Sequence, residues 1–525
     1  MKRIIFILSI VSFAISSCSK LDLAPEDYYG SSNFWNKTAQ VEAFMLGIHN
    51  HVRASSQSLL YFTLGEARGG TSKYGIAITS SSLDLSSPVK DNDFTKDKAQ
   101  LSNWGGLYGS LLQVNLFIKN VEEGCAFLTD SERNYLLGQA YGIRAFFYFM
   151  LYRTWGGVPI VKEAESIYVS ASEARKLYCP RSTPKQVMDF IKEDVNKSDN
   201  YFGNDYSFKG TRAVWSKAAT LMLKAEIYLW STKVTTGDQS PDATDLQTAK
   251  DALTPLTGRF SLLSNFSDIF DYDNKDNDEI IFTVRYSEGE STNPGGNFLV
   301  GSPSLTGGNF YLDDGTRIAS DVLNMRAQGG PQRHEYKFGL FESYDALDSR
   351  KKATFFDIYQ RNTAMQLVDQ GTLMLKGIGF VNSNNFRIFA SDMHVYRYAD
   401  VLLLMAEIEN KQGNDPSGYI NQIRQRAYGS NYNEALHGHT DAGFAANELA
   451  ILYERDKEFV WEGKRWFDVV RMQDANGRAL VFSAEANYDS SDPVLNYETE
   501  AHKLLWPVDV NTLSNDPTLE QTPGY

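Results

Sequence analysis

The stretch Ala399-Asp-Val-Leu-Leu-Leu-Met-Ala-Glu-Ile408 matches Ala218-Ala-Thr-Leu-Met-Leu-Lys-Ala-Glu-Ile227 at six of ten positions. Each segment has another amphipathic segment beside it in the sequence, and small residues such as Ala225 and Ala406 would let a neighbouring helix approach closely. We interpret the two as copies of a helix–turn–helix repeat of the tetratricopeptide type, in which each pair buries its apolar face on the next. The alternative is two unrelated helices that share a bias toward Leu, Ala and Glu.

Helical spacing of apolar residues extends outward from this repeat in both directions. The spacing predicts helices over residues 32–53, 104–121, 130–155, 183–197, 211–232, 245–257, 396–411, 416–428 and 445–472. Two stretches, at about 54–103 and 260–395, lack this period and are rich in Gly, Ser and Asn, with short β-like runs such as 280–286. The tail over 505–525 is expected to pack as extended chain. The sequence therefore predicts a mostly α protein with loop-rich insertions that contain short β-hairpins.

The N-terminus has the features of a secretory signal. Lys2 and Arg3 precede an apolar run over 4–15, which is followed by Ser16, Ser17 and Cys18. The run is too short to span a bilayer, which needs about 20 apolar residues. The order Ile-Ser-Ser-Cys resembles a relaxed lipobox, so we expect residues 1–17 to be removed, Cys18 to be acylated, and 18–32 to form a tether. The alternative is a plain signal peptide with an incidental cysteine.

Composition excludes one broad class of function. The chain has 525 residues, a formal charge of −14 and a pI near 5.1, whereas a nucleic-acid binder needs a basic surface. Aromatic residues make up 13% of the chain, which is more than a core of this size requires. Some of the rings are therefore expected to face solvent or a ligand.

Five ordered stretches resemble the SusD/RagB family of outer-membrane nutrient-binding lipoproteins of Bacteroidetes. They are the lipoprotein signal, 140–151 with Trp155-Gly-Gly-Val-Pro-Ile160, 397–407, 454–471, and the tail that begins Leu505-Trp-Pro-Val-Asp509 and ends Pro523-Gly-Tyr525. The departures are minor: family tails tend to read Pro-Ile-Pro where this chain has Pro507-Val-Asp509, and Gln-Asn-Pro where it has Gln521-Thr-Pro523.

The resemblance implies a single domain over 33–525, built on about four tetratricopeptide-like helix pairs, with the insertions forming a glycan-binding face. It also implies a partner, a SusC-like TonB-dependent outer-membrane transporter that the lipoprotein covers like a lid. The expected location is the outer membrane, with a lipid anchor and the protein facing the extracellular side. The expected function is capture of oligosaccharides and their delivery to the transporter, without an enzymatic step.

Candidate ligand residues lie in the two insertions, because sugar rings pack on aromatic faces and sugar hydroxyls need convergent donors and acceptors. The candidates are Glu66, Arg68, Lys73, Tyr74, Asn103, Trp104, Tyr286, Asn297, Phe298 and Tyr311. For each residue taken singly, an ordinary place on the surface or in the core is the alternative. As a set, at least two are expected to contact the ligand.

No catalytic, metal or cofactor motif is present in the sequence. The charges over 454–471 are interpreted as an ion network on a packed helix, since apolar residues share the segment. The run over 271–278 lacks the central Gly and the Glu of a calcium loop, and His437 and His439 have no third ligand nearby. A surface glycoside hydrolase stays open as an alternative, because a carboxylate pair leaves no sequence signature. A helical-repeat scaffold that binds no ligand, and a peptide cargo, also stay open.

Overall fold

The computed structural model describes most of the chain. Its described residues are 34–57, 60–74, 88–101, 104–163, 171–295, 310–318, 323–324 and 334–525. The signal, Cys18 and the expected tether lie outside them. Among the described residues, no helix combines the length and the apolar character that a bilayer-spanning segment needs.

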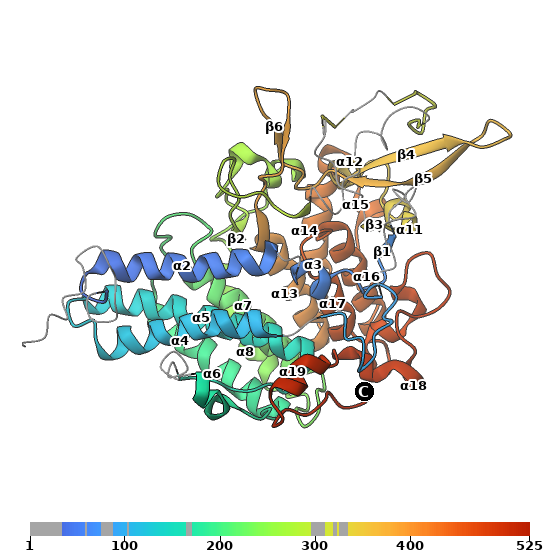
Figure 1. Cartoon of the computed structure of the whole chain (residues 1–525). Helices are drawn as coiled ribbons and strands as arrows, with labels where there is room; N and C mark the ends of the chain where they lie inside the picture. Colours follow the sequence, from blue (N-terminus) through green and yellow to red (C-terminus); the bar gives the residue numbers. More distant parts are fainter. Residues whose placement is uncertain are drawn as a thin grey trace, which may run out of the picture.

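Paired helices form the scaffold, as the sequence predicts (Figure 1). They are α2 (Thr38–Gln57), α4 (Gly105–Glu123), α5 (Asp130–Trp155), α6 (Pro184–Phe202), α7 (Lys217–Lys233), α8 (Asp245–Leu253), α13 (Tyr398–Gln412), α14 (Ser417–Tyr428), α16 (Phe444–Glu458) and α17 (Arg465–Arg471). Helices that follow one another in sequence pack against each other from α4 through α8, and α13 packs on α14 and α16. The mostly α, tetratricopeptide-like fold class is confirmed.

Helix α5 lies at the centre of this scaffold. A capping box starts it, in which Thr129 accepts a hydrogen bond from the Glu132 backbone while the Glu132 carboxylate accepts one from Thr129, an arrangement that satisfies amides the first turn leaves free. It ends at Gly156, whose φ of +74° suits glycine. Because α4, α6 and α7 all contact α5, every side chain from Tyr135 to Trp155 is buried.

The two copies of the sequence repeat occupy equivalent places in the fold. Helix α7 pairs with α8, α13 pairs with α14, and α8 also contacts α13. The Glu of each copy is buried: Glu226 accepts a hydrogen bond from Tyr396, and Glu407 forms an ion pair with Arg471. The interpretation as a structural repeat agrees with this packing.

One predicted helix is wrong. Residues 445–472 do not form a single helix, because the chain leaves the helical conformation after Glu458 and resumes it at Arg465. Trp461 and Gly463 have φ angles of +65° and +68°, which a right-handed helix cannot contain. We call the connecting residues 459–464 the helix break.

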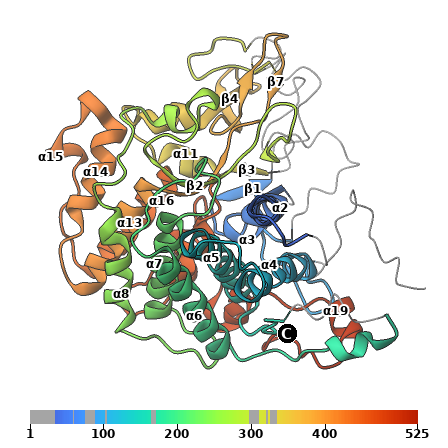
Figure 2. The same ribbon diagram turned by 90° about the vertical axis from the view of Figure 1, so that its left-hand side faces the viewer.

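The short strands form a second layer on one side of the helical scaffold (Figures 1 and 2). The strand pairs, all antiparallel, are β1 (Ser72–Tyr74) with β3 (His334–Tyr336), β2 (Ile280–Val284) with β8 (Met393–Arg397), β4 (Phe355–Arg361) with β5 (Leu367–Met374), and β6 (Phe380–Val381) with β7 (Arg387–Ile388). The short helices are α3 (Leu60–Gly65), α11 (Phe338–Glu342), α12 (Ser349–Thr354), α15 (Glu434–His437), α18 (Tyr497–Glu500) and α19 (Val510–Asn515). Helix α19 lies in the tail that was expected to be extended throughout.

Candidate functional site

The main candidate site is an open cleft beside the β4–β5 hairpin, with a volume of about 530 Å³. We call it the hairpin cleft. It is lined by Leu312, Asp313, Phe341, Ala346, Lys351, Lys352, Phe355, Phe356, Asp357, Tyr359 and Leu375. The hairpin projects from the body of the protein in the direction away from α19 (Figures 1 and 2).

The alternation of strand β4 divides its side chains between a core and the cleft. Successive side chains of a strand point to opposite faces. Ile358 packs in a small core with Leu373 and Phe389, whereas Asp357 and Tyr359 line the cleft. Phe356 is half-buried and borders both this core and the cleft. The half-buried rings of Phe341, Phe356 and Tyr359 therefore border an open space.

Tyr311 is the candidate residue that lies next to this cleft. Its backbone pairs with that of Tyr359 through two hydrogen bonds of 2.8 and 2.9 Å, and its ring lies 4.9 Å from the Arg361 guanidinium. The two residues that follow it, Leu312 and Asp313, line the cleft. The backbone pairing holds Tyr311 and the residues that follow it against β4.

The cleft combines aromatic faces with charged groups. The Lys351 ammonium lies 4.1 Å from the centre of the Phe341 ring, while Lys352 and Asp313 are exposed at the rim. Flat apolar faces with a few polar groups around them are what a sugar ring requires. The arrangement can bind a polyhydroxylated ligand by stacking and hydrogen bonding.

Glu66 lies away from this cleft, in the core. Its Oε1 accepts hydrogen bonds from the Tyr336 hydroxyl (2.6 Å) and the Trp461 amide (2.8 Å), and its Oε2 accepts one from the Gly463 amide (3.0 Å). Burial raises the pKa of Glu66 to about 7, although these hydrogen bonds oppose the shift. In this structure Glu66 holds the helix break in place.

Arg68 is also buried, in a box of aromatic rings. Its guanidinium lies 3.7 Å from the Trp466 ring and within 5.1 Å of Phe94 and Trp506, and its Nε donates to Asn92 at 2.7 Å. Burial lowers the pKa of Arg68 to about 9, so the group stays charged at neutral pH. Its contacts join the first insertion to the C-terminal tail.

The remaining candidates are dispersed. Tyr286 is fully buried, and Lys73 pairs with Glu335 at 3.1 Å across the β1–β3 ladder. The backbone of Tyr74 lies in β1. Asn103, Asn297 and Phe298 lie outside the described residues.

Trp104 lines a second surface cleft, of about 360 Å³, together with Tyr108, Leu177, Cys179 and residues of the tail. Its side chain is only 7% exposed and packs edge-on against Trp155 at 5.5 Å. This cleft lies beside α19, at the end of the molecule away from β4 (Figures 1 and 2). The structure therefore does not bring Trp104 and Tyr311 into one site.

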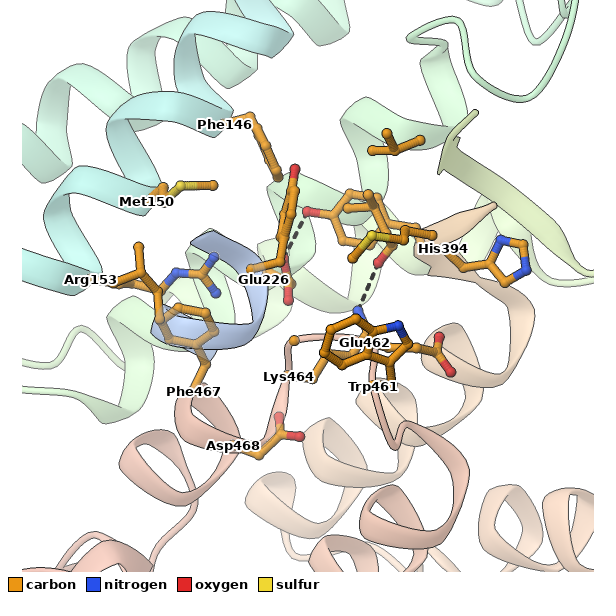
Figure 3. A pocket seen from close by; sticks show the side chains of 17 residues that line it. Phe146, Met150, Arg153, Glu226, His394, Trp461, Glu462, Lys464, Phe467 and Asp468 are labelled. Carbon is orange, nitrogen blue, oxygen red and sulfur yellow. Dashed lines mark hydrogen bonds between the residues drawn. The ribbon is translucent and has the colours of Figure 1, made fainter. Parts of the chain in front are cut away.

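A third space is a buried cavity of about 40 Å³ inside the scaffold, lined by residues such as Arg153, Glu226 and Phe467 (Figure 3). A ligand pocket for a molecule of oligosaccharide size needs at least about 300 Å³. The cavity is too small to hold a glycan.

The charged segment over 454–471 is an ion network across several elements, which agrees with the structural interpretation of its charges. Arg455 bridges Asp400 and Asp468 at 2.9 and 2.8 Å, and Glu458 pairs with Arg350 at 3.0 Å. In the part of the chain that the structure describes, no three His, Cys, Asp or Glu side chains form a group suited to a metal ion. His437 stacks on Tyr428 at 3.9 Å, and both Cys125 and Cys179 are free thiols.

Sequence reasoning missed Phe341, Phe356 and Tyr359. Phe356 and Tyr359 lie in the seven-residue strand β4, inside an insertion whose Gly and Asn residues predicted loops, and Phe341 lies in the short helix α11.

Comparisons with known proteins agree with this architecture. A family model described as "SusD family" matches residues 369–525, and one described as "Starch-binding associating with outer membrane" matches 33–229. The chain is 40% identical to a SusD superfamily protein from Bacteroides fragilis whose crystal structure is known, with 94% of this chain and 100% of that one covered and a TM-score of 0.85. The structure of B. fragilis NanU is 32% identical, with 96% and 100% covered and a TM-score of 0.82. SusD-like protein P38 of Formosa agariphila is 25% identical over 99% of this chain and 98% of its own length.

Proposed function

Because this chain belongs to the SusD superfamily, we propose that it is a surface lipoprotein that captures an oligosaccharide and delivers it to a SusC-like TonB-dependent transporter. The family is one of starch- or glycan-binding proteins associated with the outer membrane. The lipid anchor at Cys18 and the extracellular orientation are part of the proposal. They rest on the signal sequence.

The hairpin cleft is the observation that carries the proposal. Its volume of about 530 Å³ falls within the usual range for ligand pockets, roughly 300–1,000 Å³. The rings of Phe341, Phe356 and Tyr359 offer faces for the C–H surface of a sugar, while Lys351 and Asp357 offer a donor and an acceptor for its hydroxyls. Tyr311 extends this surface at the edge of β4.

Binding has to be reversible, because the ligand must pass on to the transporter. We expect dissociation constants in the micromolar to millimolar range, about −8 to −4 kcal/mol. No covalent step is involved, so the glycan leaves unchanged.

A pair of neighbouring substitutions on β4 tests the proposed site. Tyr359→Ala removes a ring that lines the cleft, whereas Gln360→Ala changes a half-buried side chain on the same strand that does not line it. With a panel of oligosaccharides in calorimetry, we expect Tyr359→Ala to lose at least about tenfold in affinity, roughly 1.4 kcal/mol. Gln360→Ala should bind as the unchanged protein does. Equal affinities for both variants would exclude the hairpin cleft.

Trp104 gives a separate test of the second cleft. If this cleft takes part in binding, Trp104→Ala weakens glycan affinity in the same titration. Unchanged affinity excludes the second cleft as a glycan-binding site. Because the side chain is buried, thermal unfolding must show that the variant is folded at the temperature of the titration.

The alternative functions are distinguished with the purified protein. A glycoside hydrolase would release reducing ends from the polysaccharide whose fragments it binds, and we expect none. A pure scaffold would bind no oligosaccharide on a broad array and would still associate with the transporter.

A further inference from the structure

A small apolar core lies between the hairpin cleft and the helix break, and we call it the connecting core. Its members are Phe62, Ala67, Tyr336, Leu340, Tyr344, Phe355, Met374, Val460 and Trp461. Phe355 also lines the hairpin cleft, whereas Val460 and Trp461 belong to the helix break. One set of packed side chains therefore joins the proposed glycan site to the segment between α16 and α17.

Phe355 is held at the floor of the cleft by three other rings. The centres of the Tyr336, Tyr344 and Phe341 rings lie 5.8, 5.9 and 6.1 Å from its own, at interplanar angles of 62°, 85° and 77°. Such edge-on contacts are a favourable geometry for aromatic pairs, and Phe355 is only 4% exposed. Because close-packed side chains transmit strain, the floor of the cleft moves only when these rings move.

The hydroxyls of the two tyrosines bind to groups at the helix break and just before it. The Tyr336 hydroxyl donates to Glu66 Oε1 at 2.6 Å, and the same oxygen accepts a hydrogen bond from the Trp461 amide at 2.8 Å. The Tyr344 hydroxyl donates to the backbone carbonyl of Lys457, in the last turn of α16, at 2.8 Å. Because a tyrosine ring is rigid, a shift of the helix break is passed on to the rings at the floor of the cleft.

The helix break has a backbone conformation that needs such support. Trp461 has a φ of +65°, a left-handed conformation that is unfavourable for a residue with a side chain. Such conformations persist where surrounding contacts enforce them, and they cluster at ligand clamps and switch segments. Glu66 supplies this contact, because its carboxylate accepts hydrogen bonds from the amides of both Trp461 and Gly463.

A buried lysine connects the other strand of the hairpin to the same segment. Lys376 follows Leu375, which lines the cleft, and its side chain is buried. Its ammonium donates to the backbone carbonyl of Glu458 at 2.9 Å and forms an ion pair with Glu462. The hairpin is therefore attached to the helix break through the connecting core on the β4 side and through Lys376 on the β5 side.

We propose that the helix break positions the floor of the hairpin cleft, with Tyr336 and Tyr344 as positioning residues, so that glycan binding in the cleft and the conformation of the break are coupled. The inference rests on the proposed function of the cleft. Coupling between two sites is reciprocal, so a break that sets the affinity for glycan is itself stabilised when glycan binds. Since α16 ends and α17 begins at the break, occupancy of the cleft then affects the helical scaffold.

A matched pair of tyrosine substitutions tests the positioning role. Tyr336→Phe keeps the ring against Phe355 and removes only the hydroxyl that donates to Glu66. Tyr141→Phe also removes a buried hydroxyl that donates to a carboxylate, that of Glu122 at 2.7 Å, but this pair lies between α4 and α5. In calorimetry with an oligosaccharide that the unchanged protein binds, we expect Tyr336→Phe to lose about threefold to tenfold in affinity and Tyr141→Phe to lose none. Losses in both variants, or in neither, would overturn the proposal.

Hydrogen exchange measures the same coupling from the other end. Saturating oligosaccharide should slow exchange in the peptide over 459–464, which contains the Trp461 and Gly463 amides that donate to Glu66, and Tyr336→Phe should reduce this slowing. Peptides from α6 provide the control and should not respond. A purely structural role leaves the rates at the break independent of glycan, so equal rates with and without it would contradict the coupling.

A failure of this inference can be told from a failure of the proposed function. Tyr344→Phe, which loses the hydrogen bond to α16, gives a second measure of positioning and should also weaken binding. If Tyr359→Ala weakens binding while Tyr336→Phe and Tyr344→Phe do not, the cleft remains the glycan site and the coupling is wrong. If no oligosaccharide binds the unchanged protein, the proposed function is wrong and the positioning role falls with it.

Discussion

Glu66 and Arg68 show how two charged side chains in a polar stretch of sequence become part of the core. Most of their partners lie far away in the chain: the amides of Trp461 and Gly463 donate to Glu66, and Arg68 donates to the backbone carbonyl of Lys503 as well as to the nearer Asn92. The sequence placed both among the candidate ligand residues, but it could not tell a ligand contact from a structural role, because the partners lie up to 435 positions away. Tyr311 could be placed beside the cleft only after its backbone pairing with Tyr359 was known.

The first prediction concerns the titration of Glu66. Burial raises its folded-state pKa to about 7 from 4.5, so the folded state binds the proton more tightly than the unfolded state does. Its contribution is therefore fully present below about pH 4.5 and is lost as the pH rises toward 7, by about 3 kcal/mol at 1.36 kcal/mol per pKa unit. We expect Glu66→Gln to lose this dependence in urea unfolding between pH 5 and pH 7.5. An identical pH dependence in both proteins would show that Glu66 stays ionised throughout.

At the scale of elements, local sequence signals predict the bounds of most helices well, but they predict the strands inside the insertions poorly. Helix α5 has the bounds that its apolar spacing predicts, since a capping box and Gly156 mark its ends. The helix break was missed because charges continue at helical spacing from Glu454 to Arg471, and because the positive φ angle of Trp461 is imposed by tertiary contacts. The β4–β5 hairpin was missed because its strands alternate only in part: Phe355 and Phe356 are adjacent apolar residues, which weakens the period-two signal of a strand.

Two glycines test how tightly the helix break is packed. A Cβ on Gly65 would lie 1.9 Å from the Gly463 carbonyl oxygen, whereas a Cβ on Gly47 in α2 would meet nothing within 4 Å. We expect Gly65→Ala to lower the free energy of unfolding, because backbone would have to move. Gly47→Ala should raise it by up to about 1 kcal/mol through helix propensity. Chemical denaturation measures both, and equal effects would mean that α3 does not press on the helix break.

At the scale of the whole molecule, buried ion pairs connect the helical scaffold to the layer of hairpins. Arg397, at the end of β8, contacts Glu279, Glu458 and Glu462 with its side chain fully buried. Such networks contribute little net stability compared with apolar packing, but removing one member is costly, because it leaves a charge without compensation. The resemblance to a family predicted the overall architecture, whereas these pairings depend on tertiary contacts that no local pattern encodes.

The network predicts a contrast between buried and exposed carboxylates. Arginine neighbours hold the pKa of Glu458 well below its usual range against the opposing effect of burial, so its contribution is present at neutral pH and is lost as the pH falls below about 4.5. We expect Glu458→Gln to cost about 3–5 kcal/mol at pH 7. Glu193→Gln, which breaks an exposed pair with Lys197, should cost at most about 1 kcal/mol. Similar losses in denaturant unfolding would contradict a buried network.

The central claim is that the hairpin cleft holds a glycan by stacking and releases it unchanged. A crystal structure of the protein soaked with an oligosaccharide selected by calorimetry tests it most directly. We predict an intact sugar chain in the cleft, with a ring face against Tyr359 or Phe341 and hydroxyls near Lys351 and Asp357. A glycan bound elsewhere with this cleft empty, or a cleaved product in it, would contradict the account.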